Sequence, residues 1–231
     1  MFEGIPAGMQ SFMVELRERN SKPWYEAHKP EYKRLVKEPF GELTFELGET
    51  VRKIDDRILI EPRRCVSRAR RDTRFTHDKS LYRNNVWISY KPALDRWDIP
   101  LFFFEVMPDH FQYGLAFLDM SPAYMRKFRD YIADCPNDFK KALQKAQAGG
   151  LSVSAECYKK PKEGAPKGLE EWYWYKNFYL VVKRYDNEIL QTRDFIPDVI
   201  QAFESASHFY EILMEVADSK PGEFSYEEYS F

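Results

Sequence analysis

Residues 101–118 have the sequence LFFFEVMPDHFQYGLAFL. Two runs rich in aromatic and β-branched residues, 101–107 and 111–118, flank Pro108-Asp109-His110, and this pattern predicts two strands joined by a tight turn. A turn this short joins antiparallel strands. Residues 101–104 are all apolar, which is typical of a strand covered on both faces. We therefore expect an antiparallel or mixed sheet with helices packed against it.

Four more segments are predicted as strands, because they are short, rich in β-branched or aromatic residues, and bounded by turn-forming residues. They are 65–71, 86–90, 151–158 and 177–185. A stretch rich in Lys, Pro and Gly, 159–168, is the expected loop between the last two.

The first quarter of the chain has a helical pattern with two breaks. Apolar residues recur three and four apart over 9–16, 25–36 and 40–54. The breaks fall at 20–23 and at Glu38-Pro39, and proline can open a helix but cannot continue one. We therefore predict three separate amphipathic helices.

The second half of the chain carries three more helical patterns. Ser121-Pro122 predicts an N-cap and a first turn for a helix whose apolar stripe covers 124–132. A further helix is expected over 134–147, closed by Gly149-Gly150. The longest stripe, 196–217, predicts one helix of about six turns.

This order of elements predicts the α+β class, with an N-terminal helical segment and further helices packed against the sheet. The sequence has no internal repeat and no linker composition, so a single domain is expected over 1–218. Residues 219–231 are acidic and aromatic. We predict that they form a C-terminal tail, either mobile or docked through its aromatic side chains.

The composition favours a cytoplasmic protein. Of the 231 residues 31% are charged, and no apolar stretch approaches the length of a membrane span. The N-terminus lacks the charged start and apolar run of a signal peptide. The cysteines Cys65, Cys135 and Cys157 have no CxxC spacing, so free thiols are expected. A net charge of −2 gives no broad attraction to nucleic acid or to an anionic membrane.

The segment from Arg63 to Arg83 departs from this balance. It contains seven arginines and one lysine against only Asp72 and Asp78, which gives a local charge of +6. The planar guanidinium pairs bidentately with carboxylate and phosphate, so a bias towards arginine favours directional anion pairing. If 65–71 is a strand, Arg68 and Arg70 share one face while the small residues and Arg71 share the other.

Three interpretations of this segment stay open. In the first, it binds a phosphate- or carboxylate-bearing small molecule, with or without catalysis. In the second, the protein is a non-catalytic scaffold or interaction protein, and the arginines form an internal ion-pair network with Asp72, Asp78 and acids of the first helices (Glu15, Glu26, Glu46). In the third, it binds nucleic acid, which a compact patch in an otherwise non-basic chain argues against.

We prefer the first interpretation and expect an anionic small molecule as the ligand. The predicted anion-binding residues are Arg68, Arg71, Arg74, Lys79 and Tyr82.

The groups nearby that could transfer a proton are Asp72, His77 and Asp78, which are therefore the candidate catalytic residues. The chain has no Walker A, GxGxxG, GxSxG or HExxH motif, so no cofactor is expected and no reaction is identified. The surrounding arginines argue against a metal ion at these residues.

The same segment resembles a known signature. Residues 68–82, RARRDTRFTHDKSLY, match R-x-x-R-D-x-R-F-x-x-[D/N]-K-x-x-Y at every defined position. This signature is similar to that of a bacterial family of about this length, domain of unknown function 2461. Residues 2–4, 20–25 and 166–178 agree less tightly, and Ser21 and Leu81 depart from the pattern where asparagine and proline are usual. The resemblance implies a conserved protein whose family has no established activity.

Three further features have a structural and a functional interpretation each. The run Trp172-Tyr173-Trp174-Tyr175 is either a stacking platform for a base or sugar or a packed strand, and we prefer packing. His28 falls on an apolar stripe and is predicted to be a core histidine. Cys65, beside many arginines, is expected to be buried and inert rather than reactive.

Overall fold

The computed structural model of the chain describes residues 2–74, 77–94, 96, 98–118, 120–160 and 163–219. The predicted tail therefore lies, except for Ser219, outside the described residues. The chain divides into two compact units, and unit 1 comprises Met1–Tyr90, Phe103–Tyr113 and Lys183–Ile200. Unit 2 comprises Lys91–Phe102, Gly114–Val182 and Gln201–Phe231. That 1–218 is a single domain stays a prediction.

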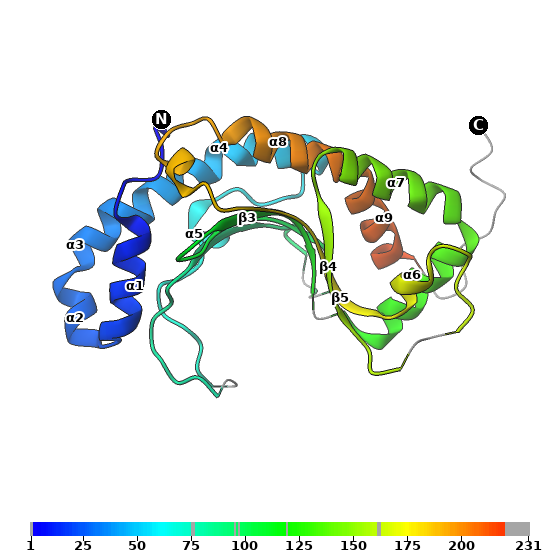
Figure 1. Cartoon of the computed structure of the whole chain (residues 1–231), viewed down its shortest axis with the longest axis horizontal. Helices are drawn as coiled ribbons and strands as arrows, with labels where there is room; N and C mark the ends of the chain where they lie inside the picture. The colour runs from blue at the N-terminus through cyan, green and yellow to red at the C-terminus, as the bar shows by residue number, and fades with distance from the viewer. Residues whose placement is uncertain are drawn as a thin grey trace. The chain divides into compact units, whose positions relative to one another are not determined.

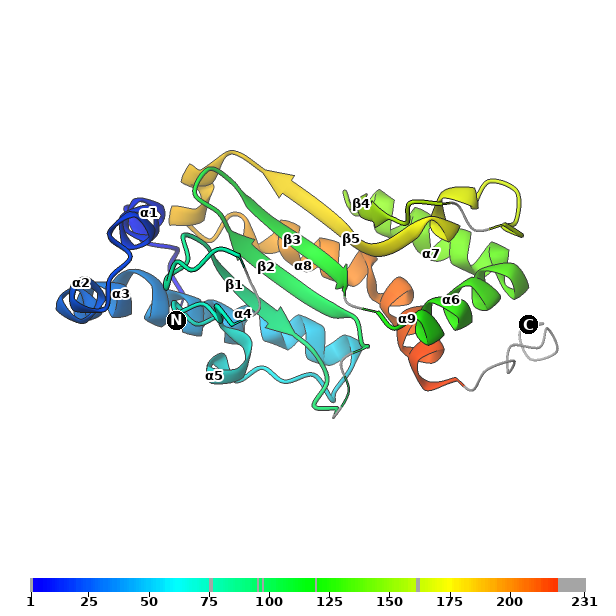
Figure 2. The same ribbon diagram turned by 90° about the horizontal axis from the view of Figure 1, so that it is seen from below.

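Five strands form one antiparallel sheet in the order β1-β2-β3-β5-β4. They are β1 Val86–Tyr90, β2 Leu101–Val106, β3 Phe111–Phe117, β4 Ser152–Cys157 and β5 Tyr175–Arg184. The predicted hairpin is confirmed, since β2 and β3 are neighbours and the Met107 amide donates to the His110 carbonyl at 2.8 Å. Figure 2 shows β1, β2 and β3 side by side. The α+β class is likewise confirmed.

One predicted strand, 65–71, is not a regular strand. Cys65 ends a short helix, α5 Pro62–Cys65, and the residues after it make only isolated bridges, Val66 to Ile88 and Arg70 to Tyr82. The Trp87 amide donates to the Ser67 hydroxyl at 3.1 Å. In a regular strand pair this amide would donate to a backbone carbonyl, so the side chain of Ser67 interrupts the ladder.

The N-terminal helices are continuous at one of the two predicted breaks. The elements are α1 Met9–Arg19, α2 Lys22–Ala27, α3 Lys29–Tyr32, the π-helical segment Lys33–Lys37 and α4 Glu38–Ile54. The break after α1 is confirmed, and Ser21 caps α2 by accepting the Trp24 amide. The break predicted at Glu38-Pro39 is wrong. The wider π turn directly before it accommodates a proline without an amide hydrogen, so the chain stays helical through Pro39.

The core of unit 1 lies between α4 and the sheet. Phe40 of α4 packs on Phe104 of β2 with ring centroids 6.3 Å apart, and Phe104 stacks on Phe195 at 5.4 Å. The Tyr90 hydroxyl of β1 donates to the Thr44 carbonyl of α4 at 2.9 Å. These contacts hold α4 against β1 and β2, and the arginine segment leads directly into β1 (Figure 1).

The core of unit 2 is an aromatic cluster under α6 Pro122–Asp134, α7 Pro136–Ala148 and α9 Ser207–Asp218. Trp172 is almost fully buried and packs on Phe139 and Phe178 with centroids 4.8 and 5.2 Å away. The α6 prediction is confirmed, since Ser121 accepts the Tyr124 amide at 3.1 Å.

The closing helix predicted over 196–217 is two helices, α8 Ile196–Ser205 and α9 Ser207–Asp218. The backbone turns at Ala206, with φ −84° and ψ −3°. The Ser207 hydroxyl donates to the Glu204 carbonyl at 2.8 Å, a local contact that competes with regular helical pairing. Apolar spacing is retained across such a turn, so periodicity alone did not reveal it. Over the described part of the chain, no helix combines the length and apolarity needed to cross a membrane.

Gly114 of β3 permits the close approach of β5, because its φ is +151° and a Cβ added there would lie 1.9 Å from the Leu180 carbonyl oxygen. We expect Gly114→Ala to lower the free energy of unfolding by roughly 2–4 kcal/mol, measured by urea denaturation. The control is Gly41→Ala in α4, whose Cβ would meet Pro62 at an ordinary 3.8 Å. That change should be neutral or stabilising by up to about 1 kcal/mol. Equal stability of the two variants would contradict the prediction.

Candidate anion-binding site

The arginine segment forms an irregular two-stranded ribbon, residues 66–71 paired with 81–88. The Arg71 amide donates to the Leu81 carbonyl at 2.8 Å, and the Arg83 amide donates to the Ala69 carbonyl at 3.1 Å. Side chains alternate as the sequence predicts, with Ala69 buried and Arg68 and Arg70 exposed. The ribbon and its loop project from the sheet beside α1 (Figure 1).

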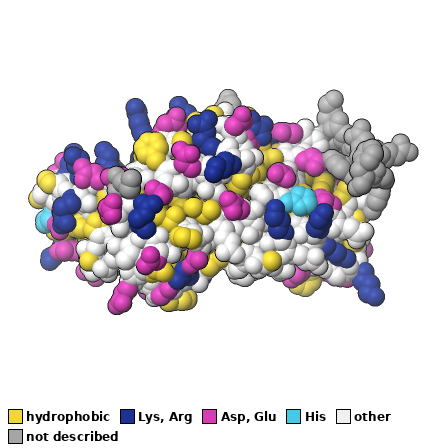
Figure 3. Space-filling model, turned by 90° about the horizontal axis from the view of Figure 1, so that it is seen from above, with side chains coloured by type: hydrophobic (Ala, Val, Ile, Leu, Met, Phe, Trp, Pro, Cys, Tyr) yellow, Lys and Arg dark blue, Asp and Glu magenta, His cyan; other side chains and the backbone are white. Residues whose placement is uncertain are grey.

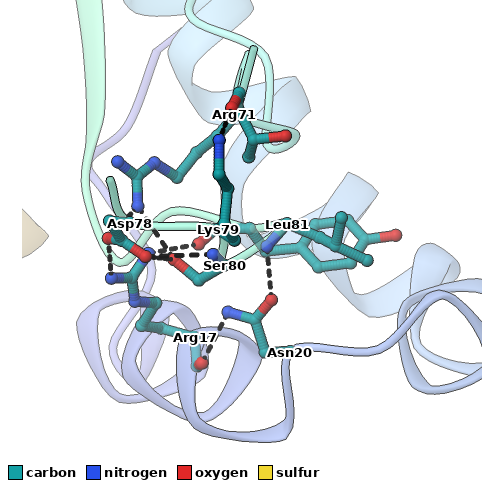
Figure 4. Close-up of polar contacts among 9 residues, drawn as sticks. Arg17, Asn20, Arg71, Asp78, Lys79, Ser80 and Leu81 are labelled. Carbon is teal, nitrogen blue, oxygen red and sulfur yellow. Dashed lines mark hydrogen bonds and ion pairs between the residues drawn. The ribbon is translucent and has the colours of Figure 1, made fainter. Parts of the chain in front are cut away.

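Asp78 is the centre of an ion-pair cluster (Figure 4). Its Oδ2 accepts from Arg17 Nη2 at 2.5 Å and from Arg71 Nη1, and its Oδ1 accepts the Ser80 amide at 2.9 Å and the Ser80 hydroxyl at 2.5 Å. The Ser80 hydroxyl, the Arg17 guanidinium and the Arg71 guanidinium hold the pKa of this carboxyl far below its usual range. Asp78 therefore stays ionised and joins α1 to the ribbon.

Two more contacts hold the ribbon on the end of α1. Arg17 Nη1 donates to the Tyr82 carbonyl at 3.0 Å, and Asn20 Oδ1 accepts the Leu81 amide at 2.5 Å. Asn20 adopts a left-handed conformation with φ +37°, and its Nδ2 donates to the Arg17 carbonyl at 2.9 Å. Together with the Asp78 cluster, these bonds fix the position of residues 78–82 against α1.

Arg74 pairs with Asp72 within the loop itself. Nε lies 3.0 Å from Oδ1 and Nη2 lies 2.6 Å from Oδ2, and this pairing lowers the pKa of Asp72 to about 2. Lys79 Nζ donates to the Thr73 carbonyl at 2.8 Å, and His77 is exposed. Of the predicted site residues, Asp72, Arg74 and Lys79 thus stabilise the loop through contacts within it, and His77 lies exposed in the same loop.

A cavity of about 270 Å³ lies on the other face of the ribbon, where α2 approaches it. We call it the arginine cavity. Its lining residues are Lys22, Tyr25, Glu26, Arg68, Ala69, Arg70, Leu81 and Tyr82.

Two tyrosines form the wall of the arginine cavity. Tyr25 and Tyr82 are stacked with centroids 4.8 Å apart, and the ring of Tyr32 meets Tyr25 edge-on at 5.6 Å. Burial raises the pKa of Tyr82, a rise that Arg70 opposes and Glu26 supports, and burial also raises the pKa of Tyr25. Both hydroxyls therefore remain protonated at neutral pH and can donate hydrogen bonds.

The cations of the arginine cavity have no acidic partner in the part of the chain that the structure describes. Within it, neither Arg68, Arg70 nor Lys22 forms an ion pair, whereas Arg71 and Arg74 each do. The one carboxylate of the lining, Glu26, pairs with Lys29 at 3.3 Å. The cavity thus presents three guanidinium or ammonium groups that form no ion pair with any carboxylate among the described residues.

The structure distributes the predicted site residues over three places. Arg68 and Tyr82 line the arginine cavity, whereas Arg71 belongs to the Asp78 cluster. Arg74 and Lys79 contact residues of their own loop. The predicted anion-binding residues did not include Arg70, Lys22 or Tyr25, which also line the cavity. The shared face of Arg68 and Arg70 could have suggested Arg70, and the partial match at 20–25 could have suggested the other two.

The helical acids expected to neutralise the arginines have other partners. Glu15 pairs with Arg19, and Glu46 pairs with Arg193 at 2.5 Å. That part of the network prediction is wrong, because the carboxylate that pairs with Arg71 is Asp78, from the loop itself, which also pairs with Arg17 of α1.

The other features singled out in the sequence have structural roles. Trp172 and Tyr175 are buried, with Trp174 exposed, so the aromatic run mainly packs and begins in a 3-10 turn, Glu170–Tyr173, rather than a strand. His28 is half-buried rather than in the core, stacked on Trp24 with centroids 3.9 Å apart.

A larger cavity, about 590 Å³, lies in unit 2. Asp138 in its lining accepts from the Tyr131 hydroxyl at 2.8 Å and lies 3.1 Å from His208 Nε2. Its charged lining is mostly acidic, with Asp134, Asp138, Glu211 and Glu215 against Lys141. This cavity is therefore unsuited to an anion. Among the described residues, no three His, Cys, Asp or Glu side chains come together in a way that could hold a metal ion.

The α+β fold and the arginine-rich ribbon define the class of protein to which the chain belongs. Residues 9–211 match the family described as "Conserved hypothetical protein (DUF2461)". The chain belongs to this family, as the signature at 68–82 indicates. No curated protein matches the chain.

The lowered pKa of Asp78 predicts how the stability of the fold changes at acidic pH. A carboxyl whose pKa is lower in the folded chain stabilises the fold above its unfolded pKa of about 3.9, and the contribution is lost as the pH falls below that value. We expect thermal unfolding midpoints of the wild type to fall more steeply than those of Asp78→Asn between about pH 5 and pH 3. At neutral pH the variant should be the less stable of the two.

The matched control is Asp72→Asn, which removes the exposed partner of Arg74. Exposed single pairs contribute little to stability. Its midpoint at neutral pH should stay closer to the wild type than that of Asp78→Asn. Parallel pH profiles for wild type and Asp78→Asn would show that the Asp78 cluster does not hold the ribbon.

Cys65 is buried, and burial, reinforced by Glu61, raises the pKa of its thiol to about 12. Cys157 is exposed. Iodoacetamide should therefore label Cys157 of the native chain at least roughly a hundredfold faster than Cys65, as peptide mass spectrometry would measure. In denaturant the two rates should converge, and rapid native labelling of Cys65 would contradict its burial.

Proposed function

We propose that the arginine cavity binds a small molecule that carries a phosphate or a carboxylate. The observation that carries this proposal is that Arg68, Arg70 and Lys22 line one cavity without an acidic partner among the described residues. Neighbouring like charges repel, and an anion between them relieves that repulsion while accepting charge-assisted hydrogen bonds. The protonated hydroxyls of Tyr25 and Tyr82 are further donors at the same cavity.

The candidate catalytic acids are poorly suited to proton transfer, which favours a binding site over a catalytic one. An efficient general base at neutral pH has a pKa near neutrality. The pKa of Asp72 is lowered to about 2 and that of Asp78 still further, so both are weak bases. Among the residues predicted as catalytic, this leaves the exposed His77, which is not part of the cavity lining.

A second, structural function of the segment is favoured by a separate observation. Asp78 bonds both Arg17 and Arg71, so part of the segment serves as an internal ion-pair network. We assign the scaffold role to Arg71 and the ligand role to Arg68 and Arg70. Nucleic-acid binding has less support, because a cavity of about 270 Å³ is small and the chain has a net charge of −2. Figure 3 shows the face that is uppermost in Figure 1, away from the ribbon, and basic and acidic side chains are interspersed there.

The test is a thermal-shift titration with inorganic phosphate, small sugar phosphates and short carboxylates, run on wild type, Arg68→Gln and Arg70→Gln. A ligand that binds the native state raises the unfolding midpoint with its concentration. Each variant should bind roughly 10- to 100-fold more weakly, the range expected for one charge-assisted hydrogen bond.

The matched control is Arg64→Gln, which removes the same charge from an exposed arginine of α5 outside the cavity. It should respond like wild type. An equal loss of response in all three variants would indicate a general charge effect, and no response in wild type would refute the proposed function.

A further inference from the structure

The arginine cavity is lined by charges of both signs. Among the described residues of the lining, Lys22, Arg68 and Arg70 contribute positive charge, and Glu26 contributes the one carboxylate. A site for a simple anion gains nothing from a carboxylate, because it repels the ligand. The presence of Glu26 therefore bears on which anions the cavity accepts.

Glu26 and Arg70 act on the same part of the cavity. Both residues line the cavity together with Tyr82. Burial is the main cause that raises the pKa of Tyr82, and the negative charge of Glu26 adds to that rise while the positive charge of Arg70 opposes it.

These opposite charges do not neutralise each other. The ion pair of Glu26 is with Lys29, and both side chains of that pair are at least half exposed. An exposed pair at i,i+3 contributes little, so Glu26 remains available to a ligand. In the described chain, the carboxylate makes no ion pair with the three cations that line the same cavity. A cavity lined by unpaired cations and an available carboxylate suits a ligand with charges of both signs.

The size of the cavity limits the ligand further. Pockets for drug-sized ligands have volumes of about 300–1,000 Å³. The arginine cavity, at about 270 Å³, lies just below that range. The rings of Tyr25 and Tyr82 with Leu81 provide an apolar wall for a short carbon stem.

We propose that the ligand of the arginine cavity is a small zwitterion, an acid that also carries an ammonium group. Its carboxylate or phosphate binds Arg68 and Arg70, and its ammonium group binds Glu26. This inference rests on the proposed function, because it assigns the acid group to the same arginines. Glu26 is then the residue that distinguishes amino acids and phosphorylated amines from simple acids.

Isothermal titration calorimetry with matched ligand pairs tests the inference. One pair is 4-aminobutyrate and butyrate, and the other is phosphoethanolamine and ethyl phosphate. At least one amine should bind wild type about tenfold or more tightly than its amine-free partner, because it gains a charge-assisted contact. Glu26→Gln should abolish that preference while the amine-free acid binds as well as before or better.

Glu18→Gln is the matched control, since Glu18 is an exposed glutamate of α1 that does not line the cavity. It should retain the wild-type preference. Equal binding of both members of each pair to wild type would overturn the zwitterion inference and leave the proposed function standing. A preference that survives in Glu26→Gln would also overturn it. If neither member of either pair binds, both this inference and the proposed function fail.

Discussion

The position of the arginine ribbon depends on one shared carboxylate. Asp78 lies between Arg17 of α1 and Arg71 of the ribbon, and Ser80 completes its hydrogen bonds. Two guanidinium groups that bond the same carboxylate oxygen repel each other, and the negative charge of Asp78 offsets that repulsion. Asp78 therefore joins segments that are 61 residues apart in the chain, and the Leu81 amide bound by Asn20 extends the same attachment. The ribbon itself has only isolated β-bridges, so its position depends on the contacts of this cluster.

Alternation along the ribbon then separates two kinds of arginine. Arg71 points to the side of α1 and pairs with Asp78, whereas Arg68 and Arg70 line the cavity beside α2. Asp78 offsets part of the positive charge on the first face, while Arg68 and Arg70 on the other face form no ion pair among the described residues. The stacked pair Tyr25 and Tyr82 closes that face and supplies hydroxyl donors. We thus assign the ion-pair network to one face of this segment and propose ligand binding for the other.

Local pattern predicted much of the fold, and its failures have local causes. The hairpin around 108–110 and the Ser121 cap depend on neighbouring residues, and both are confirmed. The break at Glu38-Pro39 failed because a π turn accommodates the proline. The helix over 196–217 failed because apolar spacing persists across the turn at Ala206.

The sequence by itself determined the concentration of charge in 63–83, the alternation that sets Arg68 and Arg70 apart from Arg71, and the family signature. Tertiary structure alone decided which arginines are neutralised and which residues complete the cavity. Asp78 and Arg71 are close in sequence, so their pairing is a local contact. The second partner of Asp78, Arg17, and the cavity residues Lys22, Tyr25 and Glu26 come from helices more than 40 residues away in the chain. Ion pairing depends on distances of a few ångströms, and packing, not sequence separation, sets those distances.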